Sequence, residues 1–233
     1  MFSVLIITAI AVNMESMKAY DVEPINDDGC SREINVYTVQ YPQFVFGSNS
    51  LTKTMNKRVK NFALDAGEMT EAEVQKLPPR PPDCGPEAVI RNGAVETSCR
   101  SMLTSGRFVS VQCHSKYNIG GQPEFADRAS TYEIGEGEVR ELGIDEWFRR
   151  KVDYEAVLTS AIRAAIAKRG KAKVRADLDD VYYDIEAASI GHGVIHVTLE
   201  HATYGRAYEN LDLPISGELR SALRPDIVAA AER

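Results

Sequence analysis

Histidines are the side chains here with the greatest scope for chemistry, and three of the four, His192, His196 and His201, lie close together. On a helix, the spacing His192-x-x-x-His196 would place two zinc ligands on one face. Apolar and polar residues alternate from 195 to 200, however, which predicts a strand, and residues four apart on a strand lie about 13 Å apart. Unless the glycines flanking His192 bend the chain, both cannot bind one ion. We therefore expect exposed or hydrogen-bonded histidines, no metal site and no cofactor.

A second pattern of residues is similar to the motifs of a class of enzymes. Asp27-Asp28-Gly29 and the His192/His196 pair look like the Asp-Asp-Gly and His-x-x-x-His pieces of polysaccharide deacetylases. In those enzymes the carboxylates end a buried barrel strand, whereas here they lie in a polar, turn-rich segment about 160 residues before the histidines. The context disfavours deacetylase catalysis, and we assign no catalytic residue.

Other chemical signatures are absent or ambiguous. The sequence has no G-x-S-x-G, Walker, H-E-x-x-H or G-x-G-x-x-G motif, so hydrolase and nucleotide-binding functions lose their main support. The basic run 168–175 begins at the C-terminal end of a predicted helix, which indicates a solvated helix end or an anion-binding patch. Tyr204 and Tyr208 have side chains that could stack on a sugar ring or pack in the core.

Composition indicates a folded globular protein. The 233 residues are 44% hydrophobic and 26% charged, which excludes wholesale disorder and a coiled coil. The net charge of −7 disfavours nucleic acid as a partner and favours basic or neutral partners.

The N-terminal segment predicts export. Residues 2–12 form an apolar block that is too short to span a membrane as a helix but fits the core of a secretory signal. We interpret residues 1–19 as a signal peptide cleaved after Ala19, and 20–31 as a polar lead-in, with no membrane span left after cleavage. The alternative is a buried N-terminal strand or helix.

Four cysteines form an even set that suits an oxidising compartment, although unpaired buried thiols remain the alternative. A two-residue hairpin turn at Ser105-Gly106 would place Cys99 opposite Gln112, so a Cys99–Cys113 bond would need a register slip. Of the three possible pairings we prefer Cys84–Cys99 with Cys30–Cys113.

Periodicity predicts an α+β protein with antiparallel sheets and two main amphipathic helices. The helices span about 51–66, ending at Gly67, and 153–169. A strand over 34–41 stops at Pro42, and the other predicted strands are 97–103, 108–117, 129–134, 181–186, 195–200 and 211–213. We expect one unit at 32–104, with a proline-rich insertion at 68–94, a second unit at 105–224 and a tail at 225–233.

The order of several loose motifs resembles a known family. The motifs are Tyr41-Pro42-Gln43-Phe44 followed by a helix carrying Asn56, then 117–121, 137–142, Trp147-Phe148, 204–207 and Leu211-x-Leu213-Pro214. Together they are similar to the extracytoplasmic domain pair of lysozyme-sensing anti-sigma factors (RsiV-like) and of some peptidoglycan deacetylases (PdaC-like), where it precedes the catalytic domain. Gln122-Pro123 replaces that family's Ala-His, and Ala207 replaces its final glycine.

The resemblance implies a periplasmic or otherwise extracytoplasmic binding module without catalytic activity. Its expected partner is a cell-wall glycan or a basic muramidase such as lysozyme; the rival hypothesis is a peptidoglycan-modifying hydrolase or deacetylase that uses His192 and His196. The long loop after the predicted strand 108–117 carries two adjacent glycines and joins two strands, which favours it for recognition. The predicted ligand-binding residues are Tyr117, Asn118, Gly120, Gly121, Gln122, Tyr204 and Tyr208.

Overall fold

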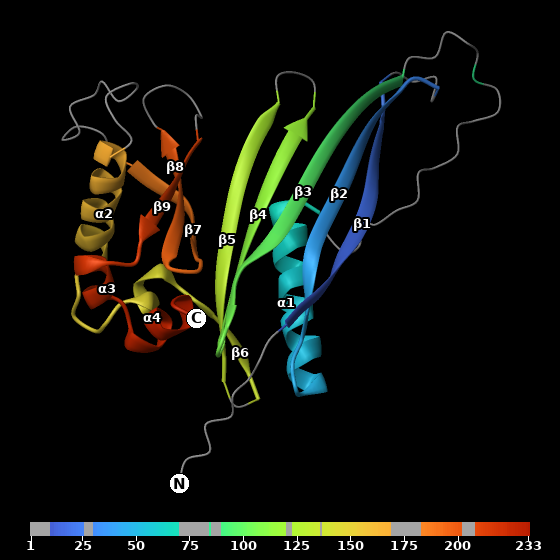
Figure 1. Ribbon diagram of the computed structural model, residues 1–233. Coiled ribbons are helices and arrows are strands. Elements are labelled where there is room, and N and C mark those ends of the chain that lie inside the picture. Colours follow the sequence, from blue (N-terminus) through green and yellow to red (C-terminus); the bar gives the residue numbers. More distant parts are fainter. Residues whose placement is uncertain are drawn as a thin grey trace.

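The structure is a computed structural model that describes residues 10–25, 30–69, 84, 90–119, 123–135, 137–168, 183–201 and 208–233. Its larger sheet has the strand order β1-β2-β3-β4-β5-β6, and its smaller sheet the order β7-β8-β9 (Figure 1). The strands of the larger sheet are β1 (Ile10–Pro24), β2 (Arg32–Val45), β3 (Ile90–Ser105), β4 (Phe108–Asn118), β5 (Glu124–Ile134) and β6 (Val139–Leu142). Those of the smaller sheet are β7 (Tyr183–Ile190), β8 (Val194–His201) and β9 (Tyr208–Pro214).

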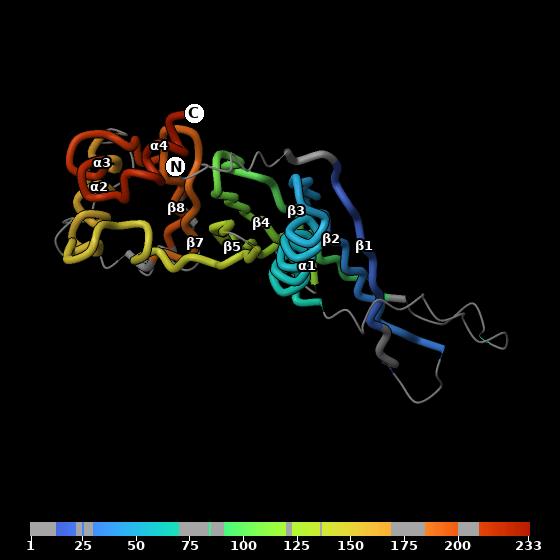
Figure 2. The backbone as a smooth tube through the Cα atoms, turned by 90° about the horizontal axis from the view of Figure 1, so that it is seen from below, coloured from blue at the N-terminus to red at the C-terminus, as the bar shows by residue number. Residues whose placement is uncertain are grey.

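Helices pack against both sheets. They are α1 (Asn49–Ala66), the 3-10 helix η2 (Ile144–Trp147), α2 (Tyr154–Lys168), α3 (Gly217–Ala222) and α4 (Pro225–Ala231). Seen from below, α1 lies against the larger sheet, while β7 and β8 lie between β5 and α2 (Figure 2). The predicted α+β class and both main helices are confirmed.

The larger sheet is mixed, because β2 and β3 pair in parallel while its other neighbouring strands pair antiparallel. Parallel neighbours need a crossover connection, and α1 lies in that connection. Helix α1 buries Leu51, Met55, Val59 and Ala63 against the sheet and ends at Gly67, whose N–H donates to the Ala63 carbonyl.

Strand β2 is longer than the sequence predicts, since it continues through Pro42 to Val45. Its pairing with β3 ends at Gln40, so the proline does not interrupt that ladder. Strand β1 includes Ile10–Ala19, which we assigned to a signal peptide, and pairs with β2 at the edge of the sheet. Cleavage after Ala19 stays a prediction, and it would divide this strand.

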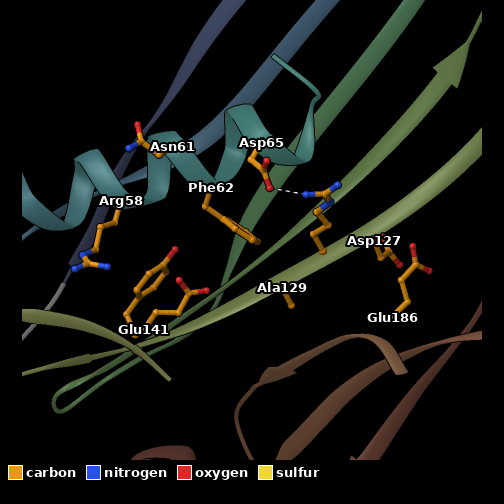
Figure 3. A pocket seen from close by; sticks show the side chains of 10 residues that line it. Arg58, Asn61, Phe62, Asp65, Asp127, Ala129, Glu141 and Glu186 are labelled. Carbon is orange, nitrogen blue, oxygen red and sulfur yellow. Dashed lines mark hydrogen bonds and ion pairs between the residues drawn. The ribbon is translucent and has the colours of Figure 1, made fainter. Parts of the chain in front are cut away.

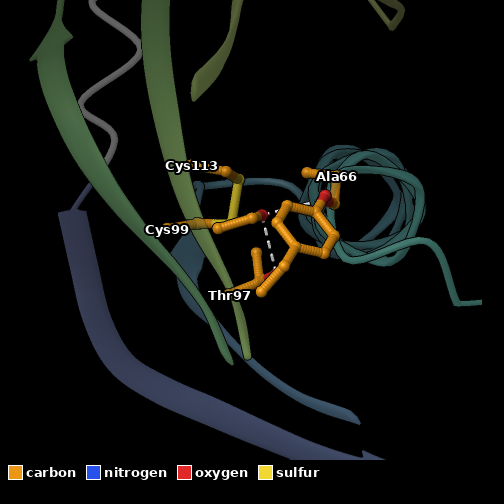
Figure 4. Close-up of a disulfide and its surroundings, with 6 residues drawn as sticks. Ala66, Thr97, Cys99 and Cys113 are labelled. Carbon is orange, nitrogen blue, oxygen red and sulfur yellow. Dashed lines mark hydrogen bonds between the residues drawn. A yellow bond between two sulfur atoms is a disulfide. The ribbon is translucent and has the colours of Figure 1, made fainter. Parts of the chain in front are cut away.

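The predicted disulfide pairing is wrong. The structure bonds Cys30 to Cys84. It also bonds Cys99 to Cys113, as Figure 4 shows. The hairpin turn is at Gly106-Arg107, with Gly106 at φ +57°, and a bulge between Ser101 and Leu103 adds one further residue to β3. Together these shifts put Cys99 directly opposite Cys113, with their Cα atoms 3.9 Å apart.

Two hydrophobic clusters form the core. One joins α1 to the larger sheet through residues such as Val39, Phe44 and Val111. The other joins β7–β9 to α2, α3 and α4 and includes Trp147 and Phe108. The predicted boundary at 104/105 falls at the β3–β4 turn, inside the larger sheet. Most of the proline-rich insertion lies outside the described residues, and its last residues, 90–94, begin β3.

Candidate functional site

The predicted ligand-binding residues lie at the ends of two hairpins. Tyr117 and Asn118 end β4, and Tyr208 begins β9 opposite Glu200 of β8. The ends of β4 and β8 point toward the same end of the molecule (Figure 1). Gly120, Gly121, Gln122 and Tyr204 lie outside the described residues, and so does the side chain of Tyr208.

Tyr117 packs against the end of α1. Its hydroxyl donates to the Ala66 carbonyl at 3.5 Å and to Glu68 Oε1 at 3.4 Å, and the side chain is half-buried. Burial, followed by the nearby Glu68 carboxylate, raises the pKa of Tyr117. This tyrosine therefore stays protonated and has part of its surface occupied by the protein itself.

His192 and His196 lie on the turn between β7 and β8 and on β8 itself. His192 is exposed, whereas His196 Nδ1 lies 2.6 Å from Asp212 Oδ1. His196 Nε2 sits close to Gly191, where a Cβ atom would lie 2.3 Å from it. Within the described part of the chain, no group of three or more His, Cys, Asp or Glu side chains could hold a metal ion.

The structure contains a second histidine–aspartate pair that the sequence did not predict. His114 of β4 stands opposite Asp127 of β5, and its Nδ1 lies 2.7 Å from Asp127 Oδ1. Asp127 is 5% exposed and also accepts a hydrogen bond from Thr198 of β8 at 3.0 Å, which links the two sheets. The β4–β5 register would have revealed the pair, because the two residues are direct cross-strand neighbours.

Both pairs line one cavity of about 410 Å³, which we call the histidine cleft. It lies where β3, β4 and β5 meet β8 and β9. Its polar lining consists of Ser98, Arg100, Gln112, His114, Asp127, His196, Asn210 and Asp212.

A larger cavity of about 760 Å³, which we call the acidic groove, lies between α1 and β7 (Figure 3). Figure 3 shows Arg58, Phe62 and Asp65 on the α1 side and Glu186 on the β7 side. Its full lining is Arg58, Asn61, Phe62, Asp65, Asp127, Arg128, Ala129, Tyr132, Glu141 and Glu186.

The groove combines acidic walls with an aromatic component. Its described lining residues carry four carboxylates and two guanidinium groups, and one of the guanidinium groups, that of Arg128, pairs with Asp65. Burial raises the pKa of Tyr132 to about 12, and the Glu141 carboxylate acts in the same direction, so this phenol is neutral. The groove is therefore suited to a cationic partner.

Comparisons with known proteins test the fold. No family model matches the sequence, and no curated protein matches it. Among solved structures, a DUF3298 family protein from Pseudomonas aeruginosa PAO1 matches with a TM-score of 0.56 at 11% identity, over 92% of this chain and 95% of that one. A DUF3298 member from Bacteroides fragilis NCTC 9343 matches with a TM-score of 0.55 at 13% identity, over 95% and 98%.

The chain has the DUF3298 fold. DUF3298 is the PdaC/RsiV-like domain, so the likeness supports the motif-based resemblance at the level of fold. The two disulfides suggest an oxidising, extracytoplasmic compartment. Among the described residues, no helix combines the length and apolarity needed to cross a membrane.

Proposed function

We propose that this DUF3298-like protein is a non-catalytic binding module of the cell envelope whose partner is a basic protein such as a muramidase. The observation that carries the proposal is the excess of carboxylates over guanidinium groups in the acidic groove. Because Arg128 is paired with Asp65, Arg58 is the remaining cation among the lining residues that the structure describes.

The groove can bind both the apolar stem and the charged end of a long basic side chain. An arginine or lysine stem would pack on Phe62 and Ala129, while its charged end would meet Glu141 and compete for Glu186, which already has an interaction within the protein. The overall charge of −7 would also raise the rate of encounter with a cationic protein. This contribution to the rate should fall as salt is added.

A cell-wall glycan is the second candidate. It is supported by the hairpin ends, where Tyr117 and Asn118 close β4 and Tyr208 opens β9 at the same end of the molecule. On this proposal, Gly120, Gly121, Gln122 and Tyr204 belong to the same recognition surface.

The experiment is calorimetric titration with hen egg-white lysozyme as the probe, at two salt concentrations. We expect binding that weakens with salt and that falls at least fivefold in a Glu141→Gln/Glu186→Gln double variant. Glu218→Gln, an exposed carboxylate on α3 outside the groove, is the control and should bind as the wild type does. No heat with lysozyme, or equal affinity in the double variant, would reject the basic-partner proposal.

A further inference from the structure

The histidine cleft lies on the face of the larger sheet that α1 leaves uncovered. Val111 and Cys113 of β4 belong to the hydrophobic cluster that contains α1. Side chains alternate along a strand, so Gln112 and His114 point to the opposite face, where β8 and β9 form the other wall of the cleft. The cleft is thus separate from the groove beside α1, although Asp127 borders both.

The cleft contains hydrogen-bonding groups that the protein does not use. Gln112 Oε1 is buried, and within the described residues no donor reaches it. Arg100, directly opposite Gln112 on β3, is exposed and has no ion pair within the same described ranges. A buried acceptor without a partner is costly, so a ligand that supplies a donor would gain from pairing it when the Gln112 amide turns toward the cleft.

Ring surfaces adjoin the cleft, because His114 lines it and Phe125, which is outside the lining, stacks on His114. The His114 and Phe125 rings are stacked, with centroids 5.5 Å apart and planes at 19°. His114 is also oriented by Asp127 at 2.7 Å, and Phe125 is 40% exposed, so part of its ring is accessible. This pair therefore presents a fixed aromatic surface beside the polar groups.

We propose that the histidine cleft binds a sugar ring of a neutral glycan. Sugar hydroxyls both donate and accept, so one can accept from the exposed Arg100 guanidinium while another donates to Gln112 Oε1 once the amide turns toward the cleft. The apolar face of the ring would lie on Phe125 if the sugar extends past His114 to the edge of the cleft. A simple anion would meet Asp127 and Asp212, and a simple cation would meet Arg100, so neither matches the lining as well. The volume of about 410 Å³ lies at the small end of ligand pockets, which suits one or two rings.

The register shows where further sugars would lie. Ser98 pairs with His114 on one side and with Gln40 on the other, and Gln40 pairs with Ser16. These side chains form a polar row across the strands, which are about 4.8 Å apart. The row leads away from the cleft over the uncovered face, so a chain of several sugars can continue along it.

The test is a titration of the full chain with the tetrasaccharide of β-1,4-linked N-acetylglucosamine, followed by calorimetry and by NMR shifts. We expect binding that falls about tenfold in Arg100→Ala and similarly in Phe125→Ala, with shifts centred on β3 and β4. Arg163→Ala, an exposed arginine on α2, is the matched control and should change nothing. Thermal unfolding of each variant checks that the fold is kept.

The opposite results are equally clear. No binding of the tetrasaccharide at millimolar concentration, or unchanged affinity in both cleft variants, overturns the proposal. Binding of inorganic phosphate in place of the sugar identifies an anion site and also overturns it. The inference shares the envelope setting of the proposed function but not its site, so lysozyme binding at the acidic groove can fail or succeed independently of this test.

Discussion

The guanidinium of Arg224 donates to the Glu133 carboxylate at 2.9 Å, although 91 residues separate the two in sequence. Glu133 lies on β5 of the larger sheet. Arg224 lies between α3 and α4, which pack in the hydrophobic cluster of the smaller sheet. Arg107 reaches the same carboxylate at 2.9 Å and also pairs with Asp226. These charges connect the C-terminal helices to the end of the larger sheet.

This charge network predicts that the free energy of unfolding decreases at low pH. Burial alone would raise the pKa of Glu133, but hydrogen bonds from Arg224 and Arg140 outweigh it and lower that pKa below its usual value of 4.5. The pKa of Asp226 is lowered in the same way, because Arg224 and Arg107 outweigh its burial. A carboxylate with a lowered folded pKa stabilises the fold above its unfolded pKa and loses that effect as pH falls through the folded pKa.

We therefore expect Glu133→Gln to lower the free energy of unfolding at pH 7 by about 1–3 kcal/mol. The difference from wild type should shrink as the pH falls below the usual carboxyl pKa of 4.5 and the wild-type Glu133 takes up its proton at its lowered pKa. Urea unfolding across this range measures both effects, and Glu138→Gln, an exposed residue before β6, is the control. A loss that is the same at pH 3 and pH 7 would contradict the charge argument.

The disulfides give a second prediction. Peptide mapping of the oxidised protein should find Cys30–Cys84 and Cys99–Cys113. By the chain-entropy estimate, replacing Cys99 and Cys113 by alanine should cost about 3 kcal/mol, and replacing Cys30 and Cys84, which close a longer loop, about 4 kcal/mol. Recovery of a Cys84–Cys99 peptide would support the pairing predicted from the sequence and contradict the β3–β4 register.

The sequence was sufficient for local features and insufficient for distant ones. Helix α1 was predictable because its apolar residues recur at helical spacing and Gly67 follows. The Cys99–Cys113 bond was not, because one extra residue near Met102 and a turn one residue later than expected shift the register. The pair His114 and Asp127 was missed for the same reason, since it depends on how β4 and β5 align.

Glycine 67 provides a third prediction. A Cβ atom there would lie 2.6 Å from Val39 Cγ2, and Val39 is fully buried in the core. Gly67→Ala should therefore destabilise the protein by about 1–3 kcal/mol through overpacking. Gly47→Ala is the matched control, because nothing lies within 4 Å of its added methyl group, and it should be neutral or slightly stabilising. Equal unfolding midpoints for the two variants would refute the close packing of Gly67.

The last prediction concerns the N-terminal strand. Glu15 accepts hydrogen bonds from the Tyr41 hydroxyl at 3.1 Å and from Gln43 Nε2 at 2.8 Å, and Ala19 is 2% exposed. A chain that begins at Tyr20 loses these contacts together with the β2 pairing from Ile10 to Ala19. We expect it to unfold with a free energy lower by more than about 2 kcal/mol, because hydrogen bonds and buried area are both lost.

Two measurements decide what this strand means for export. Urea unfolding compares the full chain with the chain starting at Tyr20, and Glu15→Gln in the full chain separates the side-chain contacts from the strand pairing. The intact mass of the protein from its native envelope then shows whether cleavage after Ala19 takes place. If the shortened chain is as stable as the full one, residues 10–19 contribute nothing to the sheet, and the signal-peptide interpretation gains from that result. If the shortened chain is unstable and the native protein keeps these residues, they act as a structural strand and the predicted cleavage is wrong.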